Sequence, residues 1–280
     1  MSKIQEAFAN GKAFIPFITA GYPDIETTRS VIKAMQENGA DLIEIGIPFS
    51  DPTAEGPVIQ TANVAALERG ITTDQIFDFV RQLRENDHIT VPMVFMTYAN
   101  VVYSYHEGGD APADGADGKD LGCFGFCRRC AEAGIDGLIL PDVPYEEKGE
   151  FQEACEKAGI DLISLIAPTS EERIQAIAAD ARGFIYIVSS LGVTGVRKTI
   201  TTDIGAITRK IRSVTDVPCA VGFGISTPEQ AAAMAAQSDG AIVGSAIIRL
   251  ITQHGDNAPV EVGNYVRRMK DALRSSYYTV

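Results

Sequence analysis

The sequence predicts an α/β protein, a closed (β/α)8 barrel of the TIM type, and three observations point to this fold class. Apolar runs rich in strand-forming residues recur eight times, and each precedes a segment with helical periodicity. Short joints that contain glycine repeat between a helix and the next strand, as in residues 133–139 and 158–163. The length of 280 residues fits one such barrel, so we expect a single domain over residues 1–280.

The expected strands are nearly continuous in hydrophobicity, as parallel strands covered on both faces should be. They are Ala13–Thr19, Asp41–Gly46, Thr90–Met96, Gly137–Pro141, Leu162–Ala167, Phe184–Ser189, Ala220–Phe223 and Ala241–Gly244. A short extra helix over Ile4–Ala9 should precede the first strand, and another should follow the eighth, from Gly244. Thr169-Ser-Glu-Glu172 fits a capping box and Thr227-Pro-Glu-Gln230 places proline in a first turn, so both predict helix starts.

Three connections are longer than a bare barrel requires. Ile47–Thr61 follows the second strand and Ser190–Thr202 follows the sixth, so both belong to the face where barrel enzymes place their active sites. The third connection, residues 103–121, is acidic and glycine-rich and has no periodicity. We expect it to be a mobile insertion within the barrel.

Composition and charge narrow the classes of function. With 24 basic and 37 acidic residues the net charge is −13, and no stripe of Lys and Arg interrupts it, which argues against a nucleic-acid partner. No apolar run reaches the roughly 18 residues of a membrane span, and Met1–Asn10 lacks the apolar stretch of a signal peptide. We therefore expect no membrane association and a cytoplasmic location. Net charge does not exclude a small phosphate ester, because helix N-termini bind phosphate through backbone N–H groups.

Glu44 is the strongest catalytic candidate. It lies near the carboxyl end of the second predicted strand, between Ile43 and Ile45, where a polar side chain faces the mouth of a barrel. Burial among apolar residues should raise the pKa of its carboxyl group toward that of a general acid/base. The alternative is a structural glutamate that bonds a neighbouring loop.

Three further carboxylates lie near the predicted mouth. Glu55 precedes Gly56 on the second loop and could close over a ligand. Asp51 precedes a proline and is more simply explained as a turn residue. Asp142 follows the fourth strand and is equally suited to anchoring loops and to acting on a substrate.

A phosphate cradle is predicted from three glycine sites in the second half of the chain. They are Gly192-Val-Thr-Gly195, Gly222-Phe-Gly224 and Gly244-Ser245. The last two follow the seventh and eighth strands, and barrels often bind phosphate with those loops and the start of a short extra helix. Each site alone is more often a simple turn, but together they predict a binding site.

The sequence lacks the residues of two other aldolase chemistries. No lysine lies in the expected strands, so a Schiff-base mechanism is not indicated. The three histidines, His88, His106 and His254, are scattered and do not suggest a metal site. Acid–base catalysis by carboxylates remains.

Cys123, Cys127 and Cys130 have the spacing of the iron–sulfur motif of radical S-adenosylmethionine enzymes. The same spacing also defines one face of a helix, where cysteines behave as small apolar residues. We favour the helix-face interpretation, because the motif follows the third strand and lacks the usual aromatic residue before its last cysteine. Cys155 and Cys219 are expected to be lone core thiols.

Leu42-Ile-Glu-Ile-Gly-Ile-Pro-Phe-Ser-Asp-Pro52, followed by Ala54-Glu-Gly-Pro57, closely resembles the signature of the tryptophan synthase alpha subunit family. Other matching stretches extend along nearly the whole chain outside the acidic insertion. They are Phe14-Ile-Pro-Phe-Ile-Thr19, Tyr98-Ala-Asn100, Asp142-Val-Pro144, Gly192-Val-Thr-Gly195, Gly222-Phe-Gly-Ile-Ser226 and Gly244-Ser-Ala-Ile247. The resemblance implies a lyase of tryptophan biosynthesis that splits indole-3-glycerol phosphate, by a retro-aldol reaction, into indole and glyceraldehyde 3-phosphate.

The resemblance also implies roles for individual residues. Glu44 would be the main acid/base, and Glu55 occupies the position of the family's second catalytic carboxylate, which is usually an aspartate one methylene shorter. The implied substrate-binding residues are Phe17, Met96, Tyr186 and Phe223 around the indole ring, Gly195, Gly224, Gly244 and Ser245 around the phosphate, and Thr194 in the same cradle.

A partner is implied as well. Members of the family pair with a beta subunit that uses pyridoxal phosphate, in an alpha2-beta2 complex, and the long loops after the second and sixth strands close and communicate with it. This chain itself would need no cofactor.

Two alternatives stay open from sequence. One is another phosphate-binding barrel enzyme, such as an isomerase of histidine or tryptophan biosynthesis, or a stand-alone indole-3-glycerol phosphate lyase. The other is a non-catalytic regulatory subunit, which the altered carboxylate at Glu55 keeps in consideration.

Overall fold

A computed structural model describes residues 2–106, 122–188, 203–222 and 224–277 of the chain. Its parallel strands form a closed barrel in which strands that are neighbours in the chain are also neighbours in the sheet. The strands are β1 (Ala13–Thr19), β2 (Ile43–Gly46), β3 (Met93–Met96), β4 (Gly137–Ile139), β5 (Asp161–Ile166), β6 (Ile185–Val188), β7 (Cys219–Gly222) and β8 (Gly240–Val243). The last strand pairs with the first, with Ala13 beside Gly240, so the predicted (β/α)8 class is confirmed.

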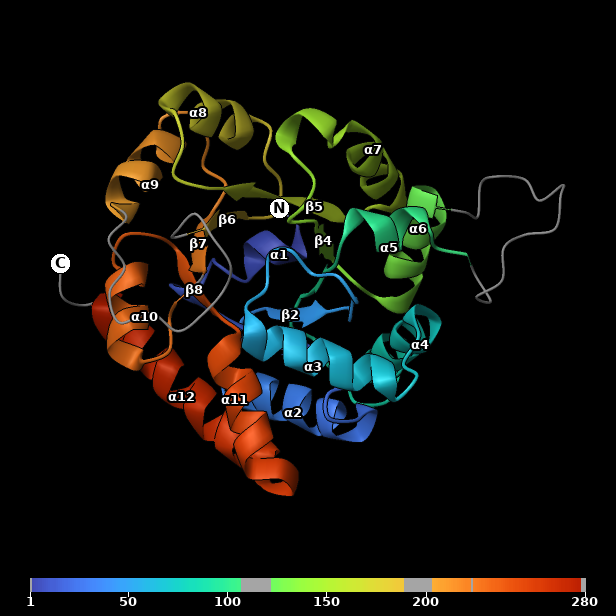
Figure 1. Ribbon diagram of the computed structural model, residues 1–280. Coiled ribbons are helices and arrows are strands. Elements are labelled where there is room, and N and C mark those ends of the chain that lie inside the picture. The colour runs from blue at the N-terminus through green and yellow to red at the C-terminus, as the bar shows by residue number, and fades with distance from the viewer. Residues whose placement is uncertain (1, 107–121, 189–202, 223, 278–280) are drawn as a thin grey trace, which may run out of the picture.

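Helices form a ring around these strands (Figure 1). They are α1 (Lys3–Glu6), α2 (Ile25–Glu37), α3 (Pro57–Glu68), α4 (Thr73–Glu85), α5 (Ala99–Tyr103), α6 (Gly122–Ala133), α7 (Gly149–Ala158), α8 (Glu171–Ala179), α9 (Ile204–Arg212), α10 (Pro228–Ala235), α11 (Ser245–His254) and α12 (Ala258–Tyr277), with the 3-10 turns η2 (Tyr145–Glu147) and η3 (Gly255–Asn257). Both predicted extra helices are present, because α1 precedes β1 and α11 follows β8.

The second, third and fourth strands are shorter than the apolar runs predicted. The second begins at Ile43, and not at Asp41. The third begins at Met93, and not at Thr90, because Pro92 cannot donate a ladder hydrogen bond. The N–H of Thr90 instead bonds the side chain of Gln36, at 2.7 Å. The fourth strand ends at Ile139, before the predicted Pro141.

Two helix starts also differ from prediction. The loop expected over Ile47–Thr61 ends early, because α3 begins at Pro57, where the missing N–H of proline removes no helical hydrogen bond. The N-cap of α8 is Ser170, one residue after the predicted Thr169, and its hydroxyl accepts from the N–H of Arg173. Thr227 caps α10 as predicted.

At the amino end of the barrel, three strands are each preceded by an aspartate that connects neighbouring elements. Each carboxylate accepts the N–H at or near the start of the preceding strand, at 2.7, 3.0 and 2.8 Å in chain order. Each also forms an ion pair with a cation from a surrounding helix. The sets are Asp41 with Phe14 and Lys270, Asp136 with Met93 and Arg84, and Asp239 with Cys219 and Arg212.

The three cysteines of α6 are buried, as the helix-face interpretation predicts. Cys127 packs against Cys155 of α7, with 3.7 Å between the sulfur atoms. Burial raises the pKa of the Cys130 thiol well above its usual value. These cysteines therefore behave as apolar contacts between two neighbouring helices.

Candidate active site

Glu44 is the second residue of β2, paired in register with Phe17 of β1 and Val94 of β3. Its side chain is only 1% exposed, and among the described residues its Oε2 atom has no hydrogen-bond partner. Burial raises the pKa of its carboxyl to about 8, and the negative charge of Glu55 adds to the shift. Glu44 is therefore mostly protonated at neutral pH and can donate a proton.

Glu55 reaches the same region from the loop between β2 and α3, and its side chain is 5% exposed. The hydroxyl of Tyr98 donates a hydrogen bond to Oε2 of Glu55. Burial raises the pKa of the Glu55 carboxyl, the Tyr98 bond lowers it, and the charge of Asp142 raises it again. The predicted pair of carboxylates thus comes together at the mouth of the barrel.

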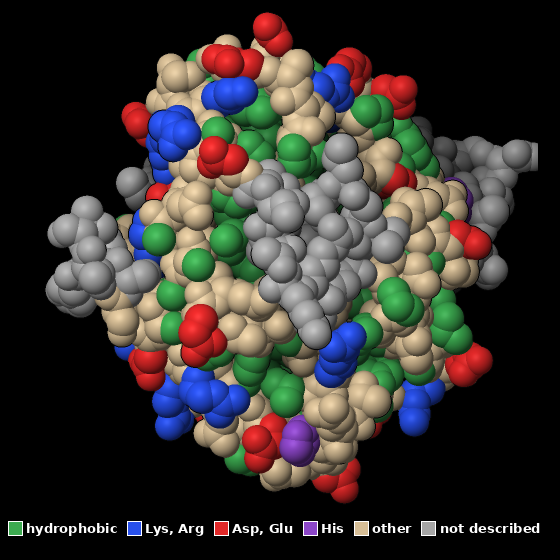
Figure 2. Space-filling model, turned by 60° about the vertical axis from the view of Figure 1, so that its left-hand side comes forward, with side chains coloured by type: hydrophobic (Ala, Val, Ile, Leu, Met, Phe, Trp, Pro, Cys, Tyr) green, Lys and Arg blue, Asp and Glu red, His purple; other side chains and the backbone are tan. Residues whose placement is uncertain are grey.

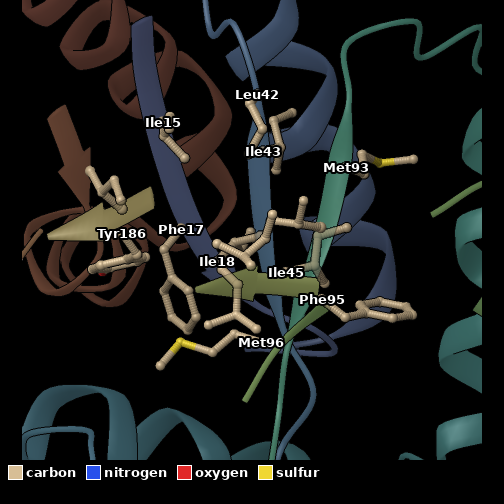
Figure 3. Close-up of a cluster of buried hydrophobic side chains, with 14 of the residues drawn as sticks. Ile15, Phe17, Ile18, Leu42, Ile43, Ile45, Met93, Phe95, Met96 and Tyr186 are labelled. Carbon is tan, nitrogen blue, oxygen red and sulfur yellow. The ribbon is translucent and has the colours of Figure 1, made fainter. Parts of the chain in front are cut away.

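Three predicted pocket residues surround this pair. Figure 3 shows the side chains of Phe17, Met96 and Tyr186, from β1, β3 and β6, in one cluster of buried side chains. A Cβ atom at Gly46 would lie 2.6 Å from the ring of Phe17, so glycine leaves the ring its place. Flat apolar walls beside a proton donor suit an aromatic ligand such as indole.

Two glycines of the predicted phosphate cradle have a second role, beside the rings of Tyr186 and Phe17. A Cβ at Gly222 would lie 2.3 Å from the hydroxyl oxygen of Tyr186, and one at Gly244 would lie 3.2 Å from the ring of Phe17. Both positions therefore leave room for the rings of Tyr186 and Phe17, a role that was not predicted from the sequence. Gly224 has a φ of +81°, a conformation that favours glycine.

The N-terminus of helix α11 directly follows β8 on this side of the barrel. Gly244 is the N-cap of α11 and Ser245 is its first residue. The first N–H groups of a helix have no partners within the helix and can bind an anion. Because β7 pairs with β8, the loops after these two strands are neighbours at the mouth, as predicted for a phosphate cradle.

Three predicted site residues, Thr194, Gly195 and Phe223, lie outside the described residues. The loop predicted over residues 190–202 and most of the acidic insertion, residues 107–121, also lie outside them.

Asp142 and Asp51 have different surroundings. Both carboxylate oxygens of Asp142 lie 3.1 Å from the backbone nitrogen of Ala99, so Asp142 holds the first turn of α5 and the anchoring alternative is supported. Asp51 is exposed and accepts a hydrogen bond from the hydroxyl of Ser50 at 2.6 Å.

The contact of Tyr98 with Glu55 was not predicted from the sequence. Tyr98 appeared there only as part of a matching stretch, although its place shortly after the third strand was a signal that it lies at the mouth.

Comparison with known proteins decides the family. The family model for the tryptophan synthase alpha chain matches residues 4–274. The chain belongs to the tryptophan synthase alpha chain family. The tryptophan synthase alpha chain of Lactiplantibacillus plantarum is 47% identical over 98% of this chain and 97% of the relative, and that of Lacticaseibacillus casei is 44% identical over 98% and 96%.

Solved structures agree with this family. The crystal structure of the tryptophan synthase alpha chain from Legionella pneumophila has a TM-score of 0.82 and 34% identity, covering 98% of both chains. A structure of Mycobacterium tuberculosis tryptophan synthase has a TM-score of 0.83 and 31% identity, again covering 98% of both chains.

Proposed function

We propose that Glu44 and Glu55 are the catalytic carboxylates of the alpha reaction in this chain. The reaction is that of its family, a carbon–carbon lyase of tryptophan biosynthesis that cleaves indole-3-glycerol phosphate to indole and glyceraldehyde 3-phosphate. One observation supports the proposal above the others. Glu44 is a buried carboxyl with a pKa of about 8, and it shares the mouth of the barrel with a second carboxylate and three apolar side chains.

Glu44 acts first as an acid in this proposal. Its proton goes to the ring carbon that carries the glycerol chain, and positive charge then develops on the indole nitrogen. Glu55 accepts the hydrogen bond of that N–H group and stabilises the charge. Glu44, now ionised, takes the proton of the adjacent hydroxyl, the carbon–carbon bond breaks, and its electrons return to the ring as the aldehyde forms.

The two ends of the substrate are bound by different parts of the mouth. We place the indole ring between Phe17, Met96 and Tyr186, where apolar walls exclude water. We place the phosphate at Gly224, Gly244 and Ser245, at the N-terminus of α11, where backbone N–H groups suit its charge. Thr194, Gly195 and Phe223 stay predictions for the same two subsites.

The proposed chemistry consists of proton transfers, so we propose that this chain needs no cofactor of its own. Membership of the family implies a beta subunit as partner. We propose an alpha2-beta2 complex in which the beta subunit alone uses pyridoxal phosphate.

We also propose that the chain acts in the cytoplasm, without a nucleic-acid or membrane partner. Figure 2 shows cationic and anionic side chains interspersed on the visible face, with no continuous basic stripe. Within the described residues, no helix combines the length and the hydropathy that crossing a membrane requires.

The test is to incubate the purified chain with indole-3-glycerol phosphate, with and without a beta subunit, and to measure indole. We expect slow cleavage by the chain alone, faster cleavage with the partner, and a loss of kcat of about 10³-fold or more in Glu44→Gln. Glu68→Gln changes an exposed glutamate of α3 and is the matched control. Wild-type kcat in Glu44→Gln would overturn the assigned acid/base, and no indole from the unaltered chain under either condition would favour the regulatory alternative.

A further inference from the structure

We propose that Tyr98 is a positioning residue that holds the carboxylate of Glu55 in this site. The proposal rests on the proposed catalytic role of Glu55 and adds a residue to it. The tyrosine hydroxyl fixes one carboxylate oxygen of the long side chain.

The first observation is that Tyr98 is held rigidly. It is the N-cap residue of α5, two residues after the end of β3, and its side chain is 2% exposed. Its hydroxyl accepts the N–H of Ala54 at 3.0 Å, and Phe49 stacks on its ring with 5.1 Å between centroids. Two residues of the loop between β2 and α3 therefore contact Tyr98, one at its hydroxyl and one at its ring, and together they fix the position of the hydroxyl.

The second observation is the direction of the hydrogen bond to Glu55. The hydroxyl has one proton, and it donates that proton to Oε2 of Glu55. Burial and the nearby carboxylate both raise the pKa of Tyr98, so the hydroxyl stays protonated and remains a donor. Such a donor stabilises the ionised form of Glu55, the form that can accept the indole N–H.

The charges around Glu55 make this donor important. Electrostatic contacts link Glu55 to Glu44 of β2, Asp142 after β4 and Tyr186 of β6, and each of these groups is either acidic or neutral. None of them attracts a carboxylate. Within the described part of the chain, this carboxylate accepts hydrogen bonds from the hydroxyl of Tyr98 and from the backbone of Glu55 itself.

The third observation concerns the length of the side chain at position 55. An aspartate on the same backbone would place its carboxyl carbon about 1.5 Å closer to the loop, because one carbon–carbon bond is missing. The hydroxyl of Tyr98 is fixed by Ala54 and Phe49 and does not follow it. The observed hydrogen bond therefore depends on the length of the Glu55 side chain. The two residues should act as a coupled pair.

A double-mutant cycle tests the coupling, with Tyr98→Phe, Glu55→Asp and the double variant compared with the unaltered chain in indole formation. We expect Tyr98→Phe alone to lower kcat about tenfold with little change in KM, as for one lost hydrogen bond to a charged group. The acid limb of its pH profile should move to higher pH, because Glu55 loses the donor that lowers its pKa. In the Glu55→Asp background the same change should lower kcat by less than about twofold.

Tyr105→Phe is the matched control. Tyr105 is also buried, and its hydroxyl donates a hydrogen bond of 2.7 Å to the carboxylate of Asp74, which is not one of the proposed site residues. Its loss should leave kcat and the pH profile unchanged. Tyr98→Phe keeps the ring and its stacking on Phe49, and circular dichroism verifies the fold.

Two results would overturn the inference: an equal loss from Tyr98→Phe in both backgrounds, or no loss in either. Glu55→Gln distinguishes this failure from a failure of the proposed function. It keeps the side-chain length and an oxygen for Tyr98 but cannot ionise, so it should lose kcat about 100-fold. Full kcat in Glu55→Gln would remove the catalytic role of Glu55 itself.

Discussion

At the scale of single residues, the environment of Glu44 sets both activity and stability. Its folded pKa of about 8 lies above its unfolded value of 4.5. As pH rises between these two values the unfolded state loses its proton while the folded state keeps it. The free energy of unfolding therefore falls with rising pH across this window, by up to about 1.4 kcal/mol per pH unit, and levels off above it.

Glu44→Gln removes this dependence, because an amide does not titrate. We expect the stability of Glu44→Gln relative to the unaltered chain to grow between about pH 5 and about pH 8. Urea unfolding at several pH values measures the difference. Glu68→Gln, at an exposed position, should show no such growth. A difference that stays constant over the window would contradict the raised pKa of Glu44.

Gly222 offers a second prediction at this scale. A methyl group there collides with the hydroxyl and ring of Tyr186, at 2.3 to 2.6 Å, so the ring must move within the pocket. We expect Gly222→Ala to lower kcat/KM about 100-fold, since small displacements at a reacting centre are costly. Gly149→Ala is the control, because a Cβ at Gly149 meets nothing within 4 Å. Unchanged kcat/KM in Gly222→Ala would show that the Tyr186 ring does not form the pocket wall.

Sequence reasoning identified single residues where the signal was local. Glu44 was predictable because it is a charged residue inside an apolar strand, and the structure places it in the barrel interior. The bond between Tyr98 and Glu55 was not predictable, because it joins residues 43 positions apart through a loop whose path the sequence does not specify.

At the scale of elements, the aspartates before β2, β4 and β8 each connect a strand, its neighbour and a helix. Asp136 accepts the N–H of Met93 and pairs with Arg84, which also bonds the carbonyl of Gly134. Both partners are mostly buried, so loss of the carboxylate charge leaves a cation without compensation.

Asp136→Asn should therefore lower the free energy of unfolding by about 3 kcal/mol, while kcat per folded molecule is retained. Urea unfolding and indole formation measure the two effects. Asp78→Asn removes an exposed ion pair with Arg81 and should cost less than about 1 kcal/mol. If both variants lost the same stability, the aspartate contact would contribute no more than an ordinary surface pair.

Element boundaries were predicted less well than the elements themselves. The third strand begins at Met93 because Pro92 ends the hydrogen-bond ladder, although the apolar pattern continues upstream. Hydrophobic periodicity reports burial, and residues at the end of a strand can be buried without pairing.

At the scale of the whole molecule, the (β/α)8 order was predictable because each strand and helix unit repeats the same apolar pattern and the same joints. Closure between β1 and β8 follows from that number of units and is observed. The region of the proposed phosphate site rests on the same order, since it requires only that the loops after β7 and β8 be neighbours, and these two strands do pair.

Closure of the barrel also constrains when the chain can finish folding. β1 obtains one of its two neighbours from residues 240–243, and Lys270 of α12 bonds both the carbonyl of Lys12 and Asp41. During synthesis, one edge of the first strand therefore stays unpaired until β8, near the end of the chain, has been made. An unpaired strand edge is a template for association with other chains, so the interval before β8 emerges is when this protein is most exposed to aggregation.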